Sequence, residues 1–142
     1  MEGERSKLRT YKILKTRVGY EGYLSKLKNI QERTCLTKLR LSNHELMIEK
    51  GRHIGLESVD RFCPFCPGKV EDEIHFLLDC KAYTELRTHA FNEFSKIYAS
   101  FPHLSCTQKF ILMNDENLFH ITAKYVLKLM ERRKKLLEPN QN

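Results

Sequence analysis

The stretch that decides the fold is FCPFCPGKVEDEIHFLLDC, residues 62–80 of a chain of 142 residues. It contains the pattern C-x2-C-x8-H-x4-C, whose members are Cys63, Cys66, His75 and Cys80. Two cysteines separated by two residues can place both sulfurs on one ion when the chain turns tightly around them, and the prolines and glycine here favour such a turn. Three thiolates and one imidazole suit a tetrahedral zinc ion. The pattern therefore predicts a zinc site.

We expect this site to be structural rather than catalytic, because four protein ligands leave no open position for a reacting molecule. A catalytic zinc would need such a position and a poised acid or base. A redox Cys-x-x-Cys motif would explain neither His75 nor Cys80. The remaining alternative is coincidental spacing, with the cysteines buried as small apolar side chains. A metal site accounts for all four residues together.

The chain has five cysteines, of which the other two are Cys35 and Cys106. Its first residues, MEGERSKLRTYK, lack the apolar segment of a secretory signal, and no apolar run approaches the roughly 18 residues that span a bilayer. We therefore expect an intracellular protein, nuclear or cytoplasmic, with reduced thiols and no membrane partner. An odd cysteine count in such a protein favours metal binding over a disulfide framework. Cys35 is expected in the core, and the role of Cys106 stays open.

The rest of the chain has the periodicity of amphipathic helices. Apolar residues recur at helical spacing in four segments, residues 33–50, 83–98, 104–113 and 116–137. Ser42 and Asn43 favour a break in the first segment, and Gly51 is expected as its C-cap. Together these patterns predict a mostly α-helical protein with a small zinc-nucleated β-hairpin, carrying a CCHC zinc site, in the middle.

The length and the 41% hydrophobic content are enough for one domain with its own core. We expect this helical zinc-binding domain to cover residues 19–137, with the zinc knuckle at residues 61–81. A basic leader at residues 1–18, expected to be frayed or to form a loosely attached first helix, would precede it. Residues 138–142 would form a disordered tail.

The net charge of +7 is concentrated before the knuckle. Residues 1–61 hold fourteen Lys and Arg against eight Asp and Glu, a net charge of +6. A positive field of this kind favours a polyanionic partner, nucleic acid first, although charged helix faces are also commonly just solvated. The candidate phosphate contacts, which would position the chain without reading bases, are Lys38, Arg40, Lys50, Arg52 and Arg61. A further basic block occupies residues 132–135.

Two aromatic residues, Phe62 and Phe65, flank the first zinc cysteine. Aromatic side chains beside zinc cysteines usually pack over the metal site, and we expect this of Phe62. For Phe65 the alternative of stacking on an unpaired RNA base stays open. His44 and His53 are expected to have surface or capping roles, with phosphate contact as the alternative.

Three segments of the chain resemble the zinc-binding module that follows the polymerase in non-LTR retrotransposon reverse transcriptases. The matching residues are Leu36, Thr37, Leu39 and Arg40, then Cys63 and Cys66, then Glu71, His75, Leu78 and Cys80, and finally Tyr83 and Arg87. The resemblance implies a non-catalytic accessory module that helps a reverse transcriptase hold RNA or DNA, with nucleic acid and a polymerase domain as partners. The chain has neither a paired-aspartate YxDD segment nor a nuclease motif, so we expect no enzymatic activity in it.

Two functions follow from these patterns. The first is a non-catalytic, zinc-scaffolded module that binds nucleic acid, either RNA or DNA. The second is a zinc-stabilised protein–protein interaction domain, because the apolar residues of 83–137 could exceed what one core hides and so leave a groove for a helix. The affinity of a nucleic-acid binder falls steeply with salt, whereas an apolar interface hardly responds.

Overall fold

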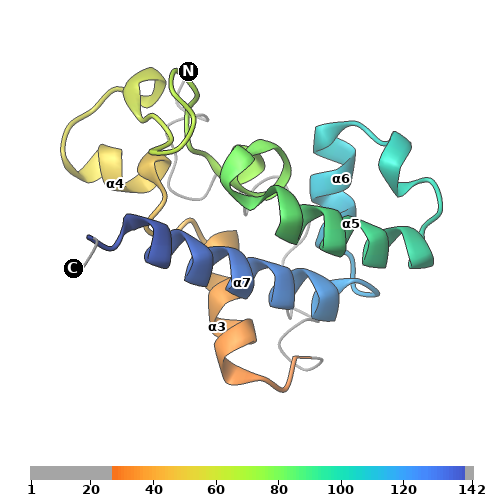
Figure 1. Ribbon diagram of the computed structural model, residues 1–142. Coiled ribbons are helices and arrows are strands. Elements are labelled where there is room, and N and C mark those ends of the chain that lie inside the picture. The colour runs from red at the N-terminus through yellow and green to blue at the C-terminus, as the bar shows by residue number, and fades with distance from the viewer. Residues whose placement is uncertain (1–26, 140–142) are drawn as a thin grey trace.

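The structure is a computed structural model that describes residues 27–139, and it is mostly α-helical (Figure 1). The α-helices are α3 (Ile30–Arg40), α4 (Met47–His53), α5 (Thr84–Ile97), α6 (Cys106–Met113) and α7 (Phe119–Leu137). Short 3-10 turns occupy Ser58–Asp60, Lys81–Tyr83 and Phe101–His103, and a π-helical turn occupies His75–Asp79. The predicted leader at residues 1–18 and residues 140–142 of the tail lie outside the described residues.

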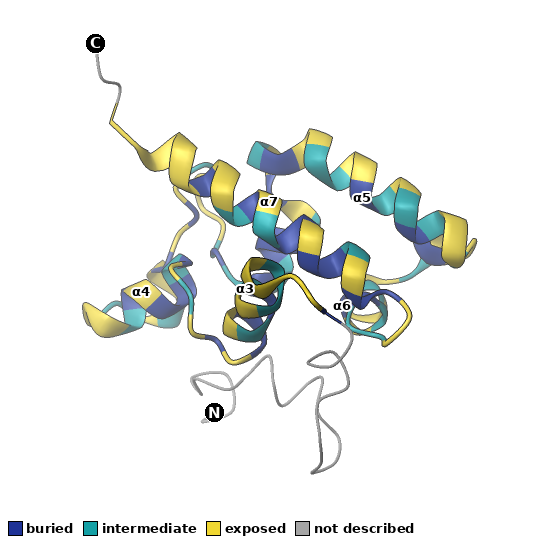
Figure 2. Cartoon of the chain, turned by 90° about the horizontal axis from the view of Figure 1, so that it is seen from below, coloured by how far each residue is buried: buried dark blue, intermediate teal, exposed yellow. Residues whose placement is uncertain are grey.

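Helix α7 lies in the middle of the molecule, with α3 packed across it and α5 running alongside it (Figure 1). Its buried residues recur every three or four positions, as Thr122, Val126, Leu129 and Arg133 do, and they form one side of the helix (Figure 2). This spacing is the cause of the packing, because it places the apolar stripe of the sequence on a single helix face. The helix ends at Leu137, two residues before Pro139.

The core between α5, α6 and the turn that joins them is aromatic. Phe94, Phe101 and Phe110 are each 1% exposed or less, and the rings of Phe94 and Phe101 lie 5.0 Å apart. Each fully buried side chain of this size contributes about 1.5–3 kcal/mol to folding. The same cluster of buried residues continues into Cys63 and Cys80, so the core and the cysteine-rich segment form one body.

Capping residues account for two helix starts. The Asn29 side chain accepts a hydrogen bond from Glu32 N–H at the start of α3. At α6, Ser105 and Gln108 form a reciprocal capping box, a pair that satisfies two N–H groups the helix leaves free. The helix predicted at residues 104–113 is therefore confirmed with a slightly later start.

The predicted break between the first two helices is confirmed, but its details differ. Helix α3 ends at Arg40, and Ser42 takes a left-handed conformation with φ of 56°. Gly51 lies inside α4 and is not the C-cap, which is Ile54. A Cβ atom on Gly51 would lie 2.5 Å from Cγ of Arg61. The glycine is thus required by the side chain that crosses the helix there, not by the end of the helix.

No β-strand forms within residues 27–139. The chain on either side of the knuckle meets in one isolated antiparallel bridge between Phe62 and Val70. The small β-hairpin expected from the sequence is therefore reduced to this bridge, because the knuckle's remaining hydrogen bonds belong to tight turns.

Candidate metal centre

The first two cysteines lie on a tight turn. Cys63 N–H donates to Lys69 O at 2.7 Å, and Lys69 N–H donates to Cys66 O at 3.2 Å. Gly68 has φ of +77°, a conformation that costs glycine little and other residues more. Phe65 N–H points at Cys63 Sγ, 3.4 Å away. These contacts direct both sulfurs to the same side of the turn.

His75 and Cys80 lie at the two ends of the π-helical turn. Asp72 Oδ1 accepts a hydrogen bond from His75 N–H at 2.7 Å, and Cys80 N–H donates to His75 O at 2.8 Å. This i to i+5 hydrogen bond defines the wider turn, a feature that occurs frequently at functional sites. Arg87 donates to Cys80 O at 2.6 Å and so fixes the end of the turn against α5.

The structure brings together the four residues predicted as metal ligands. Their ligand atoms all lie within 4.8 Å of one another, and all four residues are buried. Cys80 Sγ lies 3.7 Å from Cys63 Sγ and 3.8 Å from Cys66 Sγ. All three cysteines are free thiols, and these separations are far longer than the roughly 2.05 Å of a disulfide bond. The arrangement is a candidate metal site.

Two features test whether a metal ion fits these residues. Sulfurs that each lie about 2.3 Å from a tetrahedral ion are separated by about 3.8 Å, which is the separation seen here. His75 Nε2 is buried and has no hydrogen-bond partner among the described residues. A buried polar atom without a partner is costly, and a metal ion would use its lone pair. The donor set therefore fits a tetrahedral metal ion.

The other ring nitrogen of His75 is oriented by a carboxylate. His75 Nδ1 lies 3.4 Å from Asp79 Oδ2, which Lys69 Nζ also approaches to 3.3 Å. The Lys69 ammonium holds the pKa of Asp79 below its usual range. A carboxylate behind a metal-binding histidine fixes the ring and its tautomer. This arrangement leaves Nε2 as the ligand atom.

The electrostatics of the thiols agree with this interpretation. Burial raises the pKa of Cys63, and it raises that of Cys80 to about 12. Apolar surroundings disfavour the thiolate, so the sulfurs need a cation among them to ionise at neutral pH. The four ligands would complete a tetrahedral shell, which leaves no open coordination position.

Glu71 connects the knuckle to two helices. Its Oε1 accepts hydrogen bonds from Met47 N–H and Arg133 Nη2, both at 2.8 Å, and its Oε2 accepts from Arg133 Nε at 2.9 Å. Its backbone bonds Arg61 O and Ile48 N–H, each at 3.0 Å. One buried carboxylate thus fixes the start of α4 and the last turns of α7 beside the metal site.

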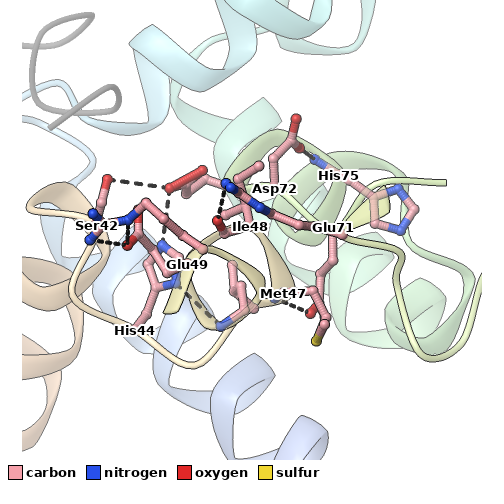
Figure 3. A network of polar contacts seen from close by, with 12 residues as sticks. Ser42, His44, Met47, Ile48, Glu49, Glu71, Asp72 and His75 are labelled. Atoms are coloured by element: carbon pink, nitrogen blue, oxygen red, sulfur yellow. Dashed lines mark hydrogen bonds and ion pairs between the residues drawn. The ribbon is translucent and has the colours of Figure 1, made fainter. Parts of the chain in front are cut away.

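A second polar cluster, which the sequence did not indicate, extends from this connection (Figure 3). His44 Nε2 lies 3.0 Å from Glu73 Oε1, and Ser42 Oγ donates to the same oxygen at 3.4 Å. His44 Nδ1 accepts from Leu46 N–H at 3.3 Å, so Nε2 carries the proton. Both partners of the His44–Glu73 pair are almost fully buried. Of the surface or capping role expected for His44, the surface position is wrong. The imidazole accepts from the N–H of Leu46, the N-cap residue of α4, and so fixes the loop before that helix.

Two of the five predicted phosphate contacts lie inside the protein. Arg40 is 5% exposed and donates to Asn114 Oδ1 at 3.0 Å. Arg61 is 8% exposed and donates to Leu56 O and Ile48 O. Neither presents its guanidinium group on a surface, and this corrects the prediction. The reason is that each guanidinium group donates to oxygen atoms of the chain itself. Arg40 donates to a side chain 74 positions away, and Arg61 donates to backbone carbonyls 5 and 13 positions away.

The other three predicted contacts are accessible. Lys38 and Lys50 are exposed, and Arg52 is half-buried beside Glu49, with 3.1 Å between Arg52 Nη2 and Glu49 Oε2. Of the basic block at residues 132–135, Arg133 is buried and the other three are exposed.

Of the two aromatic residues beside the site, Phe65 is packed and Phe62 is exposed. Phe65 packs edge-on against Tyr83, with 6.1 Å between the ring centroids. Phe62 is 45% exposed, so the expectation that it packs over the metal site is wrong. The hydroxyl group of Tyr83 is buried and has no hydrogen-bond partner within residues 27–139.

No protein-family model, no curated protein and no solved structure matches this chain. None of the helices in the described part of the chain combines the length and the apolar composition that a bilayer-spanning segment needs.

Proposed function

We propose that Cys63, Cys66, His75 and Cys80 hold one structural zinc ion. The observation that carries this proposal is the buried set of three sulfurs around the unpartnered Nε2 of His75, at separations that match tetrahedral coordination. Zinc is the ion whose usual ligands and geometry agree best with such a set. When bound, the ion would supply folding free energy rather than chemistry.

The zinc content tests this assignment directly. The full chain purified without chelator should contain about one zinc per molecule by elemental analysis, and Cys63→Ser should reduce this strongly. Cys106→Ser is the matched control, because Cys106 is exposed and lies outside the four-residue set. A wild-type content far below one zinc per chain would reject the proposal.

The zinc site would in turn support a surface that binds nucleic acid. Zinc would hold the turn that positions Glu71, and Glu71 contacts the first turn of α4 and the last turns of α7. The exposed cations near these helix ends are Lys50, Arg132, Lys134 and Lys135. Three thiolates and a neutral imidazole give a divalent ion a net charge of −1, so the metal itself would not attract phosphate. We therefore assign it an indirect role.

This surface keeps Lys50 from the segment between Lys38 and Arg61 that the sequence suggested, and it omits Arg40 and Arg61 because they are buried. It is compatible with the resemblance to the zinc-binding module of retrotransposon reverse transcriptases, in which nucleic acid is the partner. The chain would act as an accessory to a polymerase domain, without catalysis of its own.

Binding assays at several salt concentrations test this role. Replacing Arg132, Lys134 and Lys135 by Ala should weaken binding to RNA or duplex DNA. It should also flatten the dependence of log K on log salt by about 0.9 for each lost duplex phosphate contact. Ala at Lys96 and Lys109 serves as a control for charge removed elsewhere on the protein. Equal losses per removed charge in the three-charge variant and the two-charge control would mean that net charge alone drives binding and would overturn the assigned surface.

A further inference from the structure

A groove of about 690 Å³ runs between α5 and α7, on residues that neither the metal site nor the proposed phosphate surface uses. Leu86, Ala90 and Ile97 of α5 line one wall, and Ile121 and Tyr125 of α7 line the other. Ile97 is 46% exposed. Leu86 and Ile121 are partly exposed, whereas Ala90 and Tyr125 are buried. The groove therefore has an apolar floor of which Leu86, Ile97 and Ile121 remain accessible.

The rim of the groove is basic. Lys124 and Lys128 lie one turn apart on α7, both exposed, and neither forms an ion pair with any residue of 27–139. Lys96 lies on the α5 side, where Glu93 Oε1 is 2.8 Å from its Nζ. Glu93 is the sole acidic residue among those that line the groove. The rim thus carries two lysines whose charge is not compensated within the described protein.

The shape of the groove selects among possible occupants. Lining residues recur every three or four positions on both walls, from Leu86 to Ile97 on α5 and from His120 to Lys128 on α7. The eleven helical steps from Leu86 to Ile97 correspond to about 16 Å of helix. Two side-by-side helices with such an apolar seam accommodate a third helix that presents residues at i, i+3 or i+4, and i+7.

Nucleic acid fits this groove less well. An apolar floor contributes nothing to phosphate contacts, and stacking on unpaired bases requires an accessible aromatic face. Tyr125, the Phe/Tyr/Trp-type ring that lines the groove, is 2% exposed, with its hydroxyl donating to Leu77 O. The other aromatic rings in the lining are the exposed imidazoles of His89 and His120, which offer a smaller stacking face than Phe, Tyr or Trp.

We propose that the α5–α7 groove binds an acidic amphipathic helix of a partner protein. Apolar side chains of that helix occupy the floor, and Asp or Glu residues one turn apart pair with Lys124 and Lys128. The charge complementarity sets the orientation of the helix and the burial of the floor supplies most of the affinity. This site is separate from the proposed nucleic-acid surface and does not depend on it.

A designed peptide of about 14 residues tests the groove, with Leu at helical spacing and Glu beside the Leu stripe. Fluorescence anisotropy with the zinc-loaded full chain should show saturable binding. A peptide of the same composition with its Leu stripe scrambled should bind at least tenfold more weakly. Equal binding of the two peptides, or no binding of the first, overturns the proposal.

Variants locate the site and separate it from a nucleic-acid site. Lys124→Glu with Lys128→Glu should weaken the peptide about tenfold or more, because it places like charges together. Lys134→Glu with Lys135→Glu makes the same charge change outside the groove and should alter peptide binding less than twofold.

An apolar pair of variants tests the floor of the groove. Ile97→Glu should reduce peptide binding, and Ile111→Glu, at a residue exposed on α6, should not. If single-stranded RNA displaces the peptide and loses affinity only in the Lys124/Lys128 variant, the groove is a nucleic-acid site and the proposal is wrong.

Discussion

Different interactions stabilise two neighbouring segments of the protein. The first is the segment around the knuckle, residues 61–83, and the second is the helical segment that follows it, residues 84–137. The helical segment hides Phe94, Phe101 and Phe110 between regular helices. The knuckle segment has only short turns, and its buried residues include Glu71, Glu73 and His75 as well as three thiols.

This difference has an energetic cause. Apolar burial by itself stabilises a bundle of amphipathic helices. Buried carboxylates and thiols contribute only when each one is paired, because an unpaired buried charge or polar group costs free energy. The stability of the knuckle segment should therefore depend on a few specific polar partners, and the stability of the helical segment on the apolar area that it buries.

Loss of the zinc ion that we propose should give the largest effect. Its removal with a chelator, or the change of Cys80 to Ser, should unfold residues 61–83, since structural zinc contributes roughly 10–16 kcal/mol in small peptides. The α5–α7 segment should keep much of its helicity. Amide hydrogen exchange resolved by segment measures both parts. Unchanged protection of the knuckle in metal-free protein would contradict the comparison.

Breaking the buried ion pair should come next. Arg133→Ala leaves Glu71 buried without its cation, and such a change typically costs about 3–5 kcal/mol. Arg132→Ala is the matched control, because Arg132 is exposed and surface changes usually stay within about 0.5 kcal/mol. Denaturant unfolding of the zinc-loaded variants measures both. Similar losses of stability in the two variants would show that the Glu71–Arg133 ion pair does not stabilise the packing of α7 against the knuckle.

The four clustered candidate metal ligands and most helices could be predicted because their signals are local. Cys63 to Cys80 spans eighteen residues with recognisable spacing, and the stripe on α7 repeats at the helical period. The burial of Arg40 and of Arg133 could not be predicted, because the partners of these two arginines are remote in sequence. Arg40 bonds Asn114, 74 positions away, and Arg133 bonds Glu71, 62 positions away. A pattern that treats every arginine as exposed misses such contacts.

The acidic run before His75 shows the same limit. Residues 71–73 are Glu, Asp and Glu, a composition typical of the positive end of a helix. In the structure Glu71 and Glu73 are buried and bonded, and Asp72 caps the turn through His75 N–H. Helix-start statistics place acids correctly along the sequence, but they do not tell which acid will meet a cation or histidine from another element.

The next effect concerns reaction rates rather than stability. The two remaining cysteines, Cys35 and Cys106, should differ in how fast they are alkylated. Burial raises the pKa of Cys35 from 9.0 to about 11, so near pH 8 its thiolate fraction is about a hundredfold below that of an unperturbed thiol. Cys106 is exposed. In zinc-loaded protein iodoacetamide should alkylate Cys106 first and Cys35 much later, with peptide mass spectrometry as the readout. Equal rates for the two would mean that the α3–α7 contact opens readily.

The smallest effects, and the most discriminating, should come from the two tyrosines at the boundary between the regions. Tyr83 and Tyr125 are 1% and 2% exposed. The Tyr125 hydroxyl donates to Leu77 O, whereas the Tyr83 hydroxyl has no partner among residues 27–139.

Tyr125→Phe should therefore cost about 0.5–1.5 kcal/mol, the net contribution of one hydrogen bond. Tyr83→Phe should be neutral or slightly stabilising, because it removes a buried hydroxyl group that makes no hydrogen bond within the described residues. Thermal unfolding of both variants with zinc bound measures the contrast, and the same substitution at both sites controls for the change in ring polarity.

A clear loss of stability in Tyr83→Phe would contradict this prediction and would point to a missing hydrogen-bond partner. It would mean that the Tyr83 hydroxyl finds an acceptor once zinc has ionised the neighbouring thiols, and zinc affinity should then fall in that variant alone. In metal-free protein the loss should disappear.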